Sequence, residues 1–417
     1  MSLEVSRQNS FIENKKGKPL LKLPLTLLIL LTQLPIFAET KNADWESYSL
    51  RSGSRPSFNN KVSLYQNGSA QEPLKKLISQ AQKFLFIHLL SIECDQATEP
   101  FIQQIEKKAQ DGTEVFLIIN KMYSLLSLSC VSRLEQSGVQ VHRAKTHASY
   151  WVNDQAQLLI GSQSLARMFL LADGRNNLDR DVMAYAEGDI TADAILDFIE
   201  VWGKPVPQIK DSALQVHAVA KKNSPDDKPC YFLSENNELG LKSWSNALLY
   251  WIPRSQKNIF FSGVKIETER NNLSDEIKNL LVASAEKGIP VTYLGNGPDG
   301  GNGELTMVLD EYIQSQHFLS PLFKWLRNWD NKNRLKKHFS EYSKWSPQSK
   351  VKINMYDQFV HYKVWNFDDE ALIVGSANLD NDAFEKLHEA ALFCRDEKLV
   401  QEWKKAQDLD LQNSEPF

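Results

Sequence analysis

The spacing of hydrophobic positions changes along the chain in an order that occurs twice. Apolar runs at residues 83–92 and 113–120 are typical of buried strands, and residues 99–112 between them have helical spacing and end at a glycine. The same order of strand, helix and strand returns at residues 257–266, 275–288 and 289–296. Strands that alternate with helices predict a mainly parallel sheet with helices on both faces.

The two copies continue alike beyond this unit. Each adds a helical stretch, a short strand and a segment that begins with histidine, and each closes with a strand and a helix. We therefore predict a duplicated α/β fold of two halves related by approximate two-fold symmetry, each with a central mixed β-sheet flanked by helices. The halves are expected at residues 60–203 and 229–410, with a polar linker at residues 204–228. Such a chain is expected to be a monomer with an internal pseudo-dimer.

The N-terminus has a different pattern from the rest of the chain. Five basic residues precede an apolar run at residues 23–38, which predicts a signal peptide or a membrane anchor at residues 1–38. The run is shorter than the ~20 residues of a spanning helix, and Pro24 and Pro35 interrupt it. We therefore expect an exported protein, periplasmic or secreted, or one that this segment anchors to a membrane.

Export would place the cysteines in an oxidising compartment. The chain has four of them, Cys94, Cys130, Cys230 and Cys394. Four cysteines allow three pairings, and the sequence does not choose among these or exclude buried free thiols. The histidines and cysteines show no metal-binding spacing, so we expect no metal and no cofactor.

The candidate chemistry lies in residues 361–378, HYKVWNFDDEALIVGSAN, which reads as two short strands joined by a turn. Side chains alternate along a strand, so His361 and Lys363 share a face. A lysine can hold a phosphate oxygen by charge, while a neutral, oriented histidine can attack phosphorus. Gly375 and Ser376 let the backbone turn near such an anion, and the amide of Asn378 adds a donor.

The spacing H-x-K-x4-D-x6-G-S-x-N in this segment resembles the phospholipase D superfamily at every fixed position. The resemblance implies that one histidine attacks phosphorus and that a second protonates the leaving oxygen and then activates the acceptor. It implies phosphate contacts for Lys363, Ser376 and Asn378, and it places Asp368 in the catalytic set, although its position in a turn favours a structural role. Glu389 stands where the family carries a carboxylate that orients a histidine, and GSANLD is similar to bacterial cardiolipin synthases.

The first copy, HASYWVNDQAQLLIGSQS at residues 147–164, keeps this frame but departs from it twice. His147, Asp154, Gly161 and Ser162 hold their positions, with Ser162 expected at the phosphate and Asp154, Gly161 and Gly375 in structural roles. Ser149 replaces the lysine and Ser164 replaces the asparagine. Asp181 aligns with Glu389 and is expected to form a histidine–carboxylate pair within the first half.

From the retained ligands we assign His361 as the nucleophile and His147 as the acid and base. The alternative is a decayed first site, which would leave a protein that binds phosphate groups without turning them over. Arg167 or Arg180 could replace the missing lysine, but the sequence does not place them.

The substrate is suggested by residues 321–350, where lysines and arginines are interleaved with aromatic residues in a mildly acidic protein of formal net charge −4. That mixture suits an anionic lipid interface, so we expect a phospholipid substrate or membrane partner. The same residues could stack bases and neutralise phosphates, so a secreted endonuclease of the same superfamily is the competing hypothesis. A third hypothesis is that these residues form an amphipathic helix that only packs on the domain.

Overall fold

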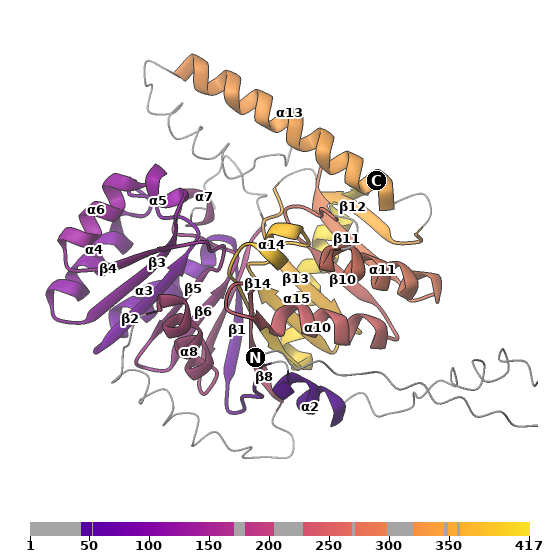
Figure 1. Ribbon diagram of the computed structural model, residues 1–417, viewed down its shortest axis with the longest axis horizontal. Coiled ribbons are helices and arrows are strands. Elements are labelled where there is room, and N and C mark those ends of the chain that lie inside the picture. Colours follow the sequence, from indigo (N-terminus) through magenta and orange to yellow (C-terminus); the bar gives the residue numbers. More distant parts are fainter. Residues whose placement is uncertain are drawn as a thin grey trace, which may run out of the picture. The chain divides into compact units, whose positions relative to one another are not determined.

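In the computed structural model, the first half is built on a sheet of seven strands in the order β1-β7-β6-β5-β2-β3-β4 (Figure 1). The strands are β1 (Lys61–Gln66), β2 (Phe84–Leu89), β3 (Glu114–Asn120), β4 (Gln140–Ala144), β5 (Tyr150–Asn153), β6 (Gln157–Gly161) and β7 (Val182–Glu187). Only β2, β3 and β4 run parallel to one another, and the other pairings are antiparallel.

The second half repeats this plan in a sheet of nine strands, ordered β16-β12-β11-β10-β13-β14-β15-β8-β9. The strands are β8 (Cys230–Asn236), β9 (Leu241–Lys242), β10 (Ile259–Ser262), β11 (Val291–Asn296), β12 (Lys352–Tyr356), β13 (Lys363–Phe367), β14 (Ala371–Gly375), β15 (Glu389–Cys394) and β16 (Ser414–Pro416). The predicted duplication into two mixed sheets is therefore confirmed. The expectation of mainly parallel sheets is wrong, because each histidine-led segment folds into an antiparallel hairpin.

Helices cover both sheets. In the first half they are α3 (Gln71–Gln80), α4 (Glu99–Gln110), α5 (Tyr123–Leu126), α6 (Leu128–Gln136), α7 (Arg167–Leu170) and α8 (Thr191–Trp202). The others are α2 (Ala43–Arg51), α10 (Ser243–Trp251), α11 (Leu273–Glu286), α13 (Ser320–Trp345), α14 (Asn381–Glu385) and α15 (Glu397–Gln412), and the short 3-10 helices are Asn67–Ala70 and Ile252–Arg254. The glycine that ends the helix predicted at residues 99–112 is Gly112, whose φ of 94° suits a residue without a β-carbon.

The two halves share one hydrophobic core. Phe86 of β2 stacks on Phe198 of α8, and the same cluster includes Val364 of β13 and Trp403 of α15. The outer face of each sheet packs in a separate cluster against its own helices. Because burial of apolar surface is the main favourable term in folding, this shared core fixes the sheets against each other and defines the seam between the halves.

Both cysteine pairs are bridged. Cys94, beyond β2, is bonded to Cys130 of α6, and Cys230 at the start of β8 is bonded to Cys394 at the end of β15. The sequence left the pairing open, because neither partner lies near the other along the chain.

The structure describes residues 43–51, 53–170, 180–203, 228–268, 272–297, 320–345, 349–356 and 359–417. The predicted signal peptide or anchor at residues 1–38 and almost all of the linker at residues 204–228 lie outside them, so both stay predictions. Among the helices described, none has the length and apolar content needed to cross a bilayer.

Candidate active site

The two histidine-led segments meet at the seam. Each is held there by backbone hydrogen bonds to the other half, since His147 N donates to His388 O at 2.9 Å and His361 N donates to Arg180 O at 2.8 Å. The matching bridges, Thr146 with His388 and Arg180 with Val360, follow the same two-fold relation. The internal symmetry therefore extends to the backbone that carries the catalytic candidates.

Each histidine is paired with the carboxylate of the opposite half. His147 Nδ1 donates to Glu389 Oε1 at 2.8 Å, and His361 Nδ1 donates to Asp181 Oδ2 at 2.9 Å. All four side chains are buried. The expectation that His147 and Asp181 form a pair within the first half is thus wrong. The pairs cross the seam because β7 and β15 begin next to the opposite half's histidine.

The serines of the two Gly-Ser pairs hold these carboxylates in place. Ser162 Oγ donates to Asp181 Oδ1, and Ser376 Oγ donates to Glu389 Oε2. Their hydroxyl protons are therefore engaged within the site, whereas the sequence predicts both serines at the phosphate. A phosphate contact by either serine stays a prediction, and the geometry gives both of them the role of orienting a carboxylate.

Lys363 fixes the proton positions on His361. Its ammonium Nζ lies 3.0 Å from His361 Nε2. An ammonium group can only donate, so Nε2 must be the unprotonated nitrogen and Nδ1 must carry the proton given to Asp181. The ring is thereby presented as the tautomer that a nucleophile needs, with its lone pair beside a cation.

The two halves use different side chains to hold the loop that follows β2 in the first half and β10 in the second. Asn378 Oδ1 accepts from Val264 N at 3.1 Å, and in the first half Ser164 Oγ accepts from Ser91 N at 3.3 Å. The serine therefore replaces the loop contact of the asparagine but lacks its amide donor. This explains how the first half keeps its shape while it loses a group that could face an anion.

The glycine that both copies share also has a packing reason. A β-carbon on Gly161 would collide with Val182 O of β7, and one on Gly375 would collide with Ala391 of β15. Both glycines therefore let the neighbouring strand approach closely, beside the carboxylate that it carries.

Asp154 and Asp368 lie at the other ends of the two hairpins. Asp368 accepts backbone hydrogen bonds from Gln256, Lys257 and Asn258, and Asp154 accepts them from the backbone of residues 82–84. The structural role expected for Asp154 agrees with this geometry. The inclusion of Asp368 in the catalytic set is wrong, because β13 starts at Lys363 and carries the chain away from the site.

The missing lysine of the first half is not replaced by Arg180. Ser149, which stands in its position, is buried and donates to Gln163 O. The guanidinium of Arg180 lies 2.7 Å from Asp410 Oδ1, and this partner neutralises its charge. Arg167 begins α7, where its backbone N donates to Glu93 Oε2 at 2.9 Å.

A second layer of buried polar groups supports the paired histidines. Asp197 of α8 accepts from His388 Nε2 at 3.0 Å and from Tyr150 OH at 2.7 Å. Asp410 of α15 pairs with Arg180 and accepts from Tyr362 OH at 3.0 Å. Residues 180 and 388 are those whose carbonyls accept the backbone N–H groups of the two candidate histidines. Sequence reasoning missed this layer, since a buried aspartate on a helix has no local pattern that marks it.

In the described part of the chain, one group brings potential metal ligands together: His88, Asp197 and His388, with ligand atoms within 4.8 Å of one another. Several of their atoms already have protein partners, whereas His88 Nδ1 is buried without a hydrogen-bond partner among the described residues. Thr146 Oγ1 lies 2.7 Å from His88 Nε2, and both oxygens of Asp197 accept hydrogen bonds. Hydrogen bonding therefore accounts for the buried carboxylate and for one nitrogen of His88.

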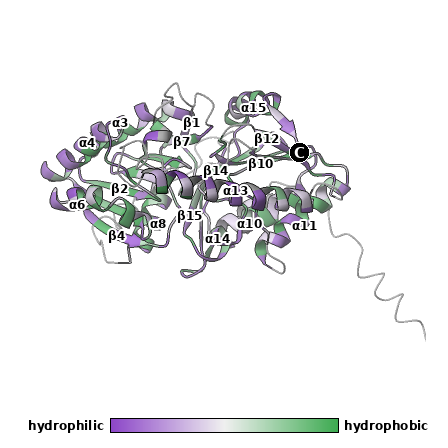
Figure 2. Ribbon diagram, turned by 90° about the horizontal axis from the view of Figure 1, so that it is seen from above, coloured by the Kyte–Doolittle hydropathy of each residue, from purple (hydrophilic) through white to green (hydrophobic). Residues whose placement is uncertain are grey.

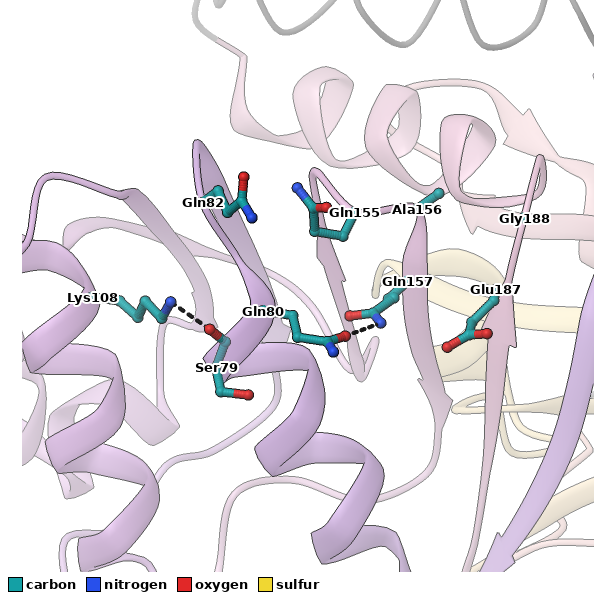
Figure 3. A pocket seen from close by; sticks show the side chains of 9 residues that line it. All are labelled: Ser79, Gln80, Gln82, Lys108, Gln155, Ala156, Gln157, Glu187 and Gly188. Carbon is teal, nitrogen blue, oxygen red and sulfur yellow. Dashed lines mark hydrogen bonds between the residues drawn. The ribbon is translucent and has the colours of Figure 1, made fainter.

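A polar depression lies at the opposite strand ends of the first sheet (Figure 3). Gln157 and Glu187 line it, and Lys108 there donates to a backbone carbonyl of α3 at 2.6 Å. It adjoins the hairpin turn that carries Asp154 rather than the end that carries His147, so it is separate from the candidate active site.

Comparison with known proteins gives a matching family model and a similar protein sequence. The family model described as "Cardiolipin synthase, PLD-like domain" matches residues 249–409. An uncharacterized protein of Streptococcus mutans is 27% identical over 172 residues, which make up 37% of this chain and 37% of that protein. The aligned region therefore spans well under half of that relative's length.

Two solved structures are similar in fold. Phosphatidylserine synthase of Haemophilus influenzae has a TM-score of 0.59 at 13% identity, with 89% of this chain and 92% of that chain covered. Polyphosphate kinase of Porphyromonas gingivalis has a TM-score of 0.53 at 12% identity, with 84% of this chain and 47% of that chain covered. At such identities the likeness concerns the fold, and both halves of the chain take part in it.

Proposed function

On the premise that the chain belongs to the phospholipase D superfamily, we propose that it is a metal-independent phosphodiesterase or phosphatidyltransferase that acts on phospholipids. The observation that carries this proposal is the pair of buried histidine–carboxylate contacts across the seam, with His361 Nε2 unprotonated beside Lys363. A nucleophile, a charge clamp and a second histidine for proton transfer are then present together.

In this mechanism, His361 Nε2 attacks phosphorus and the bond to the leaving oxygen breaks. Lys363 holds a non-bridging oxygen, and Asp181 stabilises the positive charge that develops on the attacking ring. His147, oriented by Glu389, gives its proton to the leaving alcohol. The same ring then takes a proton from water or an alcohol, which attacks the phosphohistidine and releases His361.

The test is an activity panel in EDTA that compares labelled phosphatidylglycerol and phosphatidylcholine with single-stranded DNA. We expect release or transfer of a lipid head group by the wild type and its loss in His361→Ala. His142→Ala, a histidine of β4 outside the site, is the control and should stay active. Hydrolysis of DNA and of no lipid would favour the nuclease instead.

A catalytically silent phosphate-binding protein is the second candidate, and one observation favours it. Ser149 leaves the first half without its lysine, and Arg180 is neutralised by Asp410. Loss of a cation from an anionic transition state can cost several kcal/mol. Binding of a phospholipid head group with no turnover in the panel would support this candidate.

A further inference from the structure

The exposed large hydrophobic side chains gather in two segments of the described chain. Seven of the eleven lie there. They are Met122, Leu125, Leu126 and Leu128 around α5, and Leu322, Trp325 and Trp329 on the first half of α13. Since exposed apolar side chains on a soluble surface are usually scattered, this concentration indicates a surface that meets another apolar phase.

The segment at residues 122–128 is joined to the candidate active site by hydrogen bonds. Asn120, at the end of β3, accepts from Met122 N at 2.9 Å and donates to Thr146 O at 2.6 Å. Thr146 directly precedes His147. The exposed segment therefore leaves the first sheet at the edge where its catalytic histidine lies, and the disulfide between Cys94 and Cys130 fastens the helix that follows it.

The helix α13 is joined to the site of the second half in a similar way. Its last residues are packed, with Tyr342 and Trp345 fully buried, whereas Trp325 and Trp329 are 60% and 57% exposed. Lys337 Nζ, in the middle of the helix, lies 2.7 Å from Glu267 Oε2.

Glu267 N in turn donates to Leu379 O at 2.9 Å, next to Asn378 of the site. The exposed half of α13, which is labelled in Figure 1, therefore extends from a base fixed beside the loop that carries Asn378.

Charge adds to this arrangement. Lys324, Lys332 and Lys336 of α13 and Lys121 beside the first segment are exposed. Leu322, Trp325 and Trp329 are spaced three and four residues apart, so they share one face of the helix. The mixture of hydrophobic and hydrophilic positions along α13 can be followed in Figure 2. Tryptophan with lysine is the composition that binds at the head-group level of a bilayer.

We propose that residues 122–128 and 322–329 form one docking surface for an anionic phospholipid bilayer. This inference rests on the proposed function and specifies the partner of the same site. It favours a bilayer over single-stranded nucleic acid, because Met122, Leu125 and Leu126 offer aliphatic side chains that insert among lipids but give bases no ring to stack on. Docking there would bring the head groups to the edge that carries both histidines.

The experiment is hydrogen exchange of the full chain, resolved by peptide, with vesicles of phosphatidylglycerol and phosphatidylcholine. We expect slower exchange at residues 122–128 and 322–329 and unchanged exchange at α8. Vesicles of phosphatidylcholine alone should protect less, because the lysines then lack anionic partners. The readout is local, so an N-terminal membrane anchor would not mimic it. No protection of either segment on anionic vesicles, or protection by single-stranded DNA in its place, would overturn the proposal.

Variants separate docking from catalysis. Trp325→Ser with Trp329→Ser, and likewise Leu125→Ser with Leu126→Ser, should lower kcat/KM on vesicles at least about tenfold. The same variants should hydrolyse dispersed short-chain phospholipid at the wild-type rate. Leu50→Ser, an exposed leucine of α2 with 56% exposure, is the matched control and should change neither rate.

Two further outcomes are informative. An equal loss on vesicles and on dispersed lipid would show a structural defect and overturn the proposal. If no lipid is turned over at all but vesicle protection persists at both segments, the docking surface stands and the proposed function fails.

Discussion

The crossed pairing of histidines and carboxylates predicts that Glu389 and Asp181 act on different steps. Glu389→Gln should impair proton transfer by His147, and Asp181→Asn should impair nucleophilic attack by His361, because those are the rings that they contact. If each carboxylate served the histidine of its own half, the two phenotypes would be exchanged.

The size of the effect follows from the geometry. A charged imidazole and a carboxylate 2.8 Å apart attract each other by about 6 kcal/mol at an effective dielectric constant of about 20. An amide keeps the hydrogen bond but not the charge, so we expect about 3 kcal/mol of that stabilisation to be lost, or roughly a hundredfold in rate.

The assay uses a substrate with an activated leaving group that needs no proton. With it, Glu389→Gln should form the phosphohistidine at the wild-type rate and accumulate it, since the acceptor is no longer activated. Asp181→Asn should form it about a hundredfold more slowly. Trapping under alkaline denaturing conditions measures both. Glu187→Gln, at the far end of β7, is the control. Accumulation in Asp181→Asn with slow formation in Glu389→Gln would refute the reasoning.

Three other predictions concern the first half and stability. Ser149→Lys with Ser164→Asn should raise turnover if only the charge clamp is missing, measured as kcat on dispersed lipid, and no gain would show that the half is built for proton transfer alone. Burial lowers the pKa of His88 well below its ordinary value of 6.5, and the charges of His388 and His142 lower it further. Below pH 6.5 the unfolded chain therefore binds a proton at His88, whereas the folded protein keeps this side chain neutral. Stability should therefore fall below pH 6.5 by up to about 1.4 kcal/mol per pH unit, and urea unfolding of His88→Gln should lose that slope. The disulfide between Cys230 and Cys394 joins residues that are 164 positions apart in the sequence. Replacing both cysteines with alanine should therefore lower the free energy of unfolding by up to about 5 kcal/mol, measured by urea unfolding.

The sequence predicted the order of strands and helices along each half, but it did not predict the contacts between the two halves. The repeat of strand, helix and strand and the frame around His361 could be predicted because each depends on spacing within a few dozen residues. The strands β1 and β8 were missed, since they lie upstream of the repeat and pair with β7 and β15 late in each half. Their register depends on pairing with strands far away along the chain rather than on any local pattern.

The partner of each histidine could not be predicted for the same reason. His147 and Glu389 are separated by 242 residues, and alignment of the two copies pairs equivalent positions within a half. Two-fold symmetry is equally compatible with histidine–carboxylate pairs formed within each half and with pairs formed between the halves. The way the halves pack against each other decides between these options, and that packing is set by the shared core around Phe198 and Trp403.

The buried ion pair of Arg180 and Asp410 helps to position the backbone that holds His361 at the seam. Burial raises the pKa of Asp410 although Arg180 counteracts it, while burial opposes the charge of Arg180 and Asp410 on balance raises its pKa. A carboxylate whose pKa is raised by folding is held at a cost at neutral pH, so the pair is a weak source of stability. The pair instead fixes the backbone of Arg180, whose carbonyl oxygen accepts a hydrogen bond from His361 N at 2.8 Å.

We therefore expect that Asp410→Asn alone is strongly destabilising, by about 3 kcal/mol, since it leaves a buried guanidinium without its carboxylate. The double variant Arg180→Met with Asp410→Leu should recover most of that stability in urea unfolding, because no buried charge is then left unpaired. It should still form the phosphohistidine more slowly than the wild type, since the segment that carries Arg180 O is no longer fixed to α15. If the double variant lost as much stability as Arg180→Met and Asp410→Leu lose together when measured singly, the coupling between the two residues would be contradicted. Wild-type activity in a stable double variant would mean that the shared core alone positions His361.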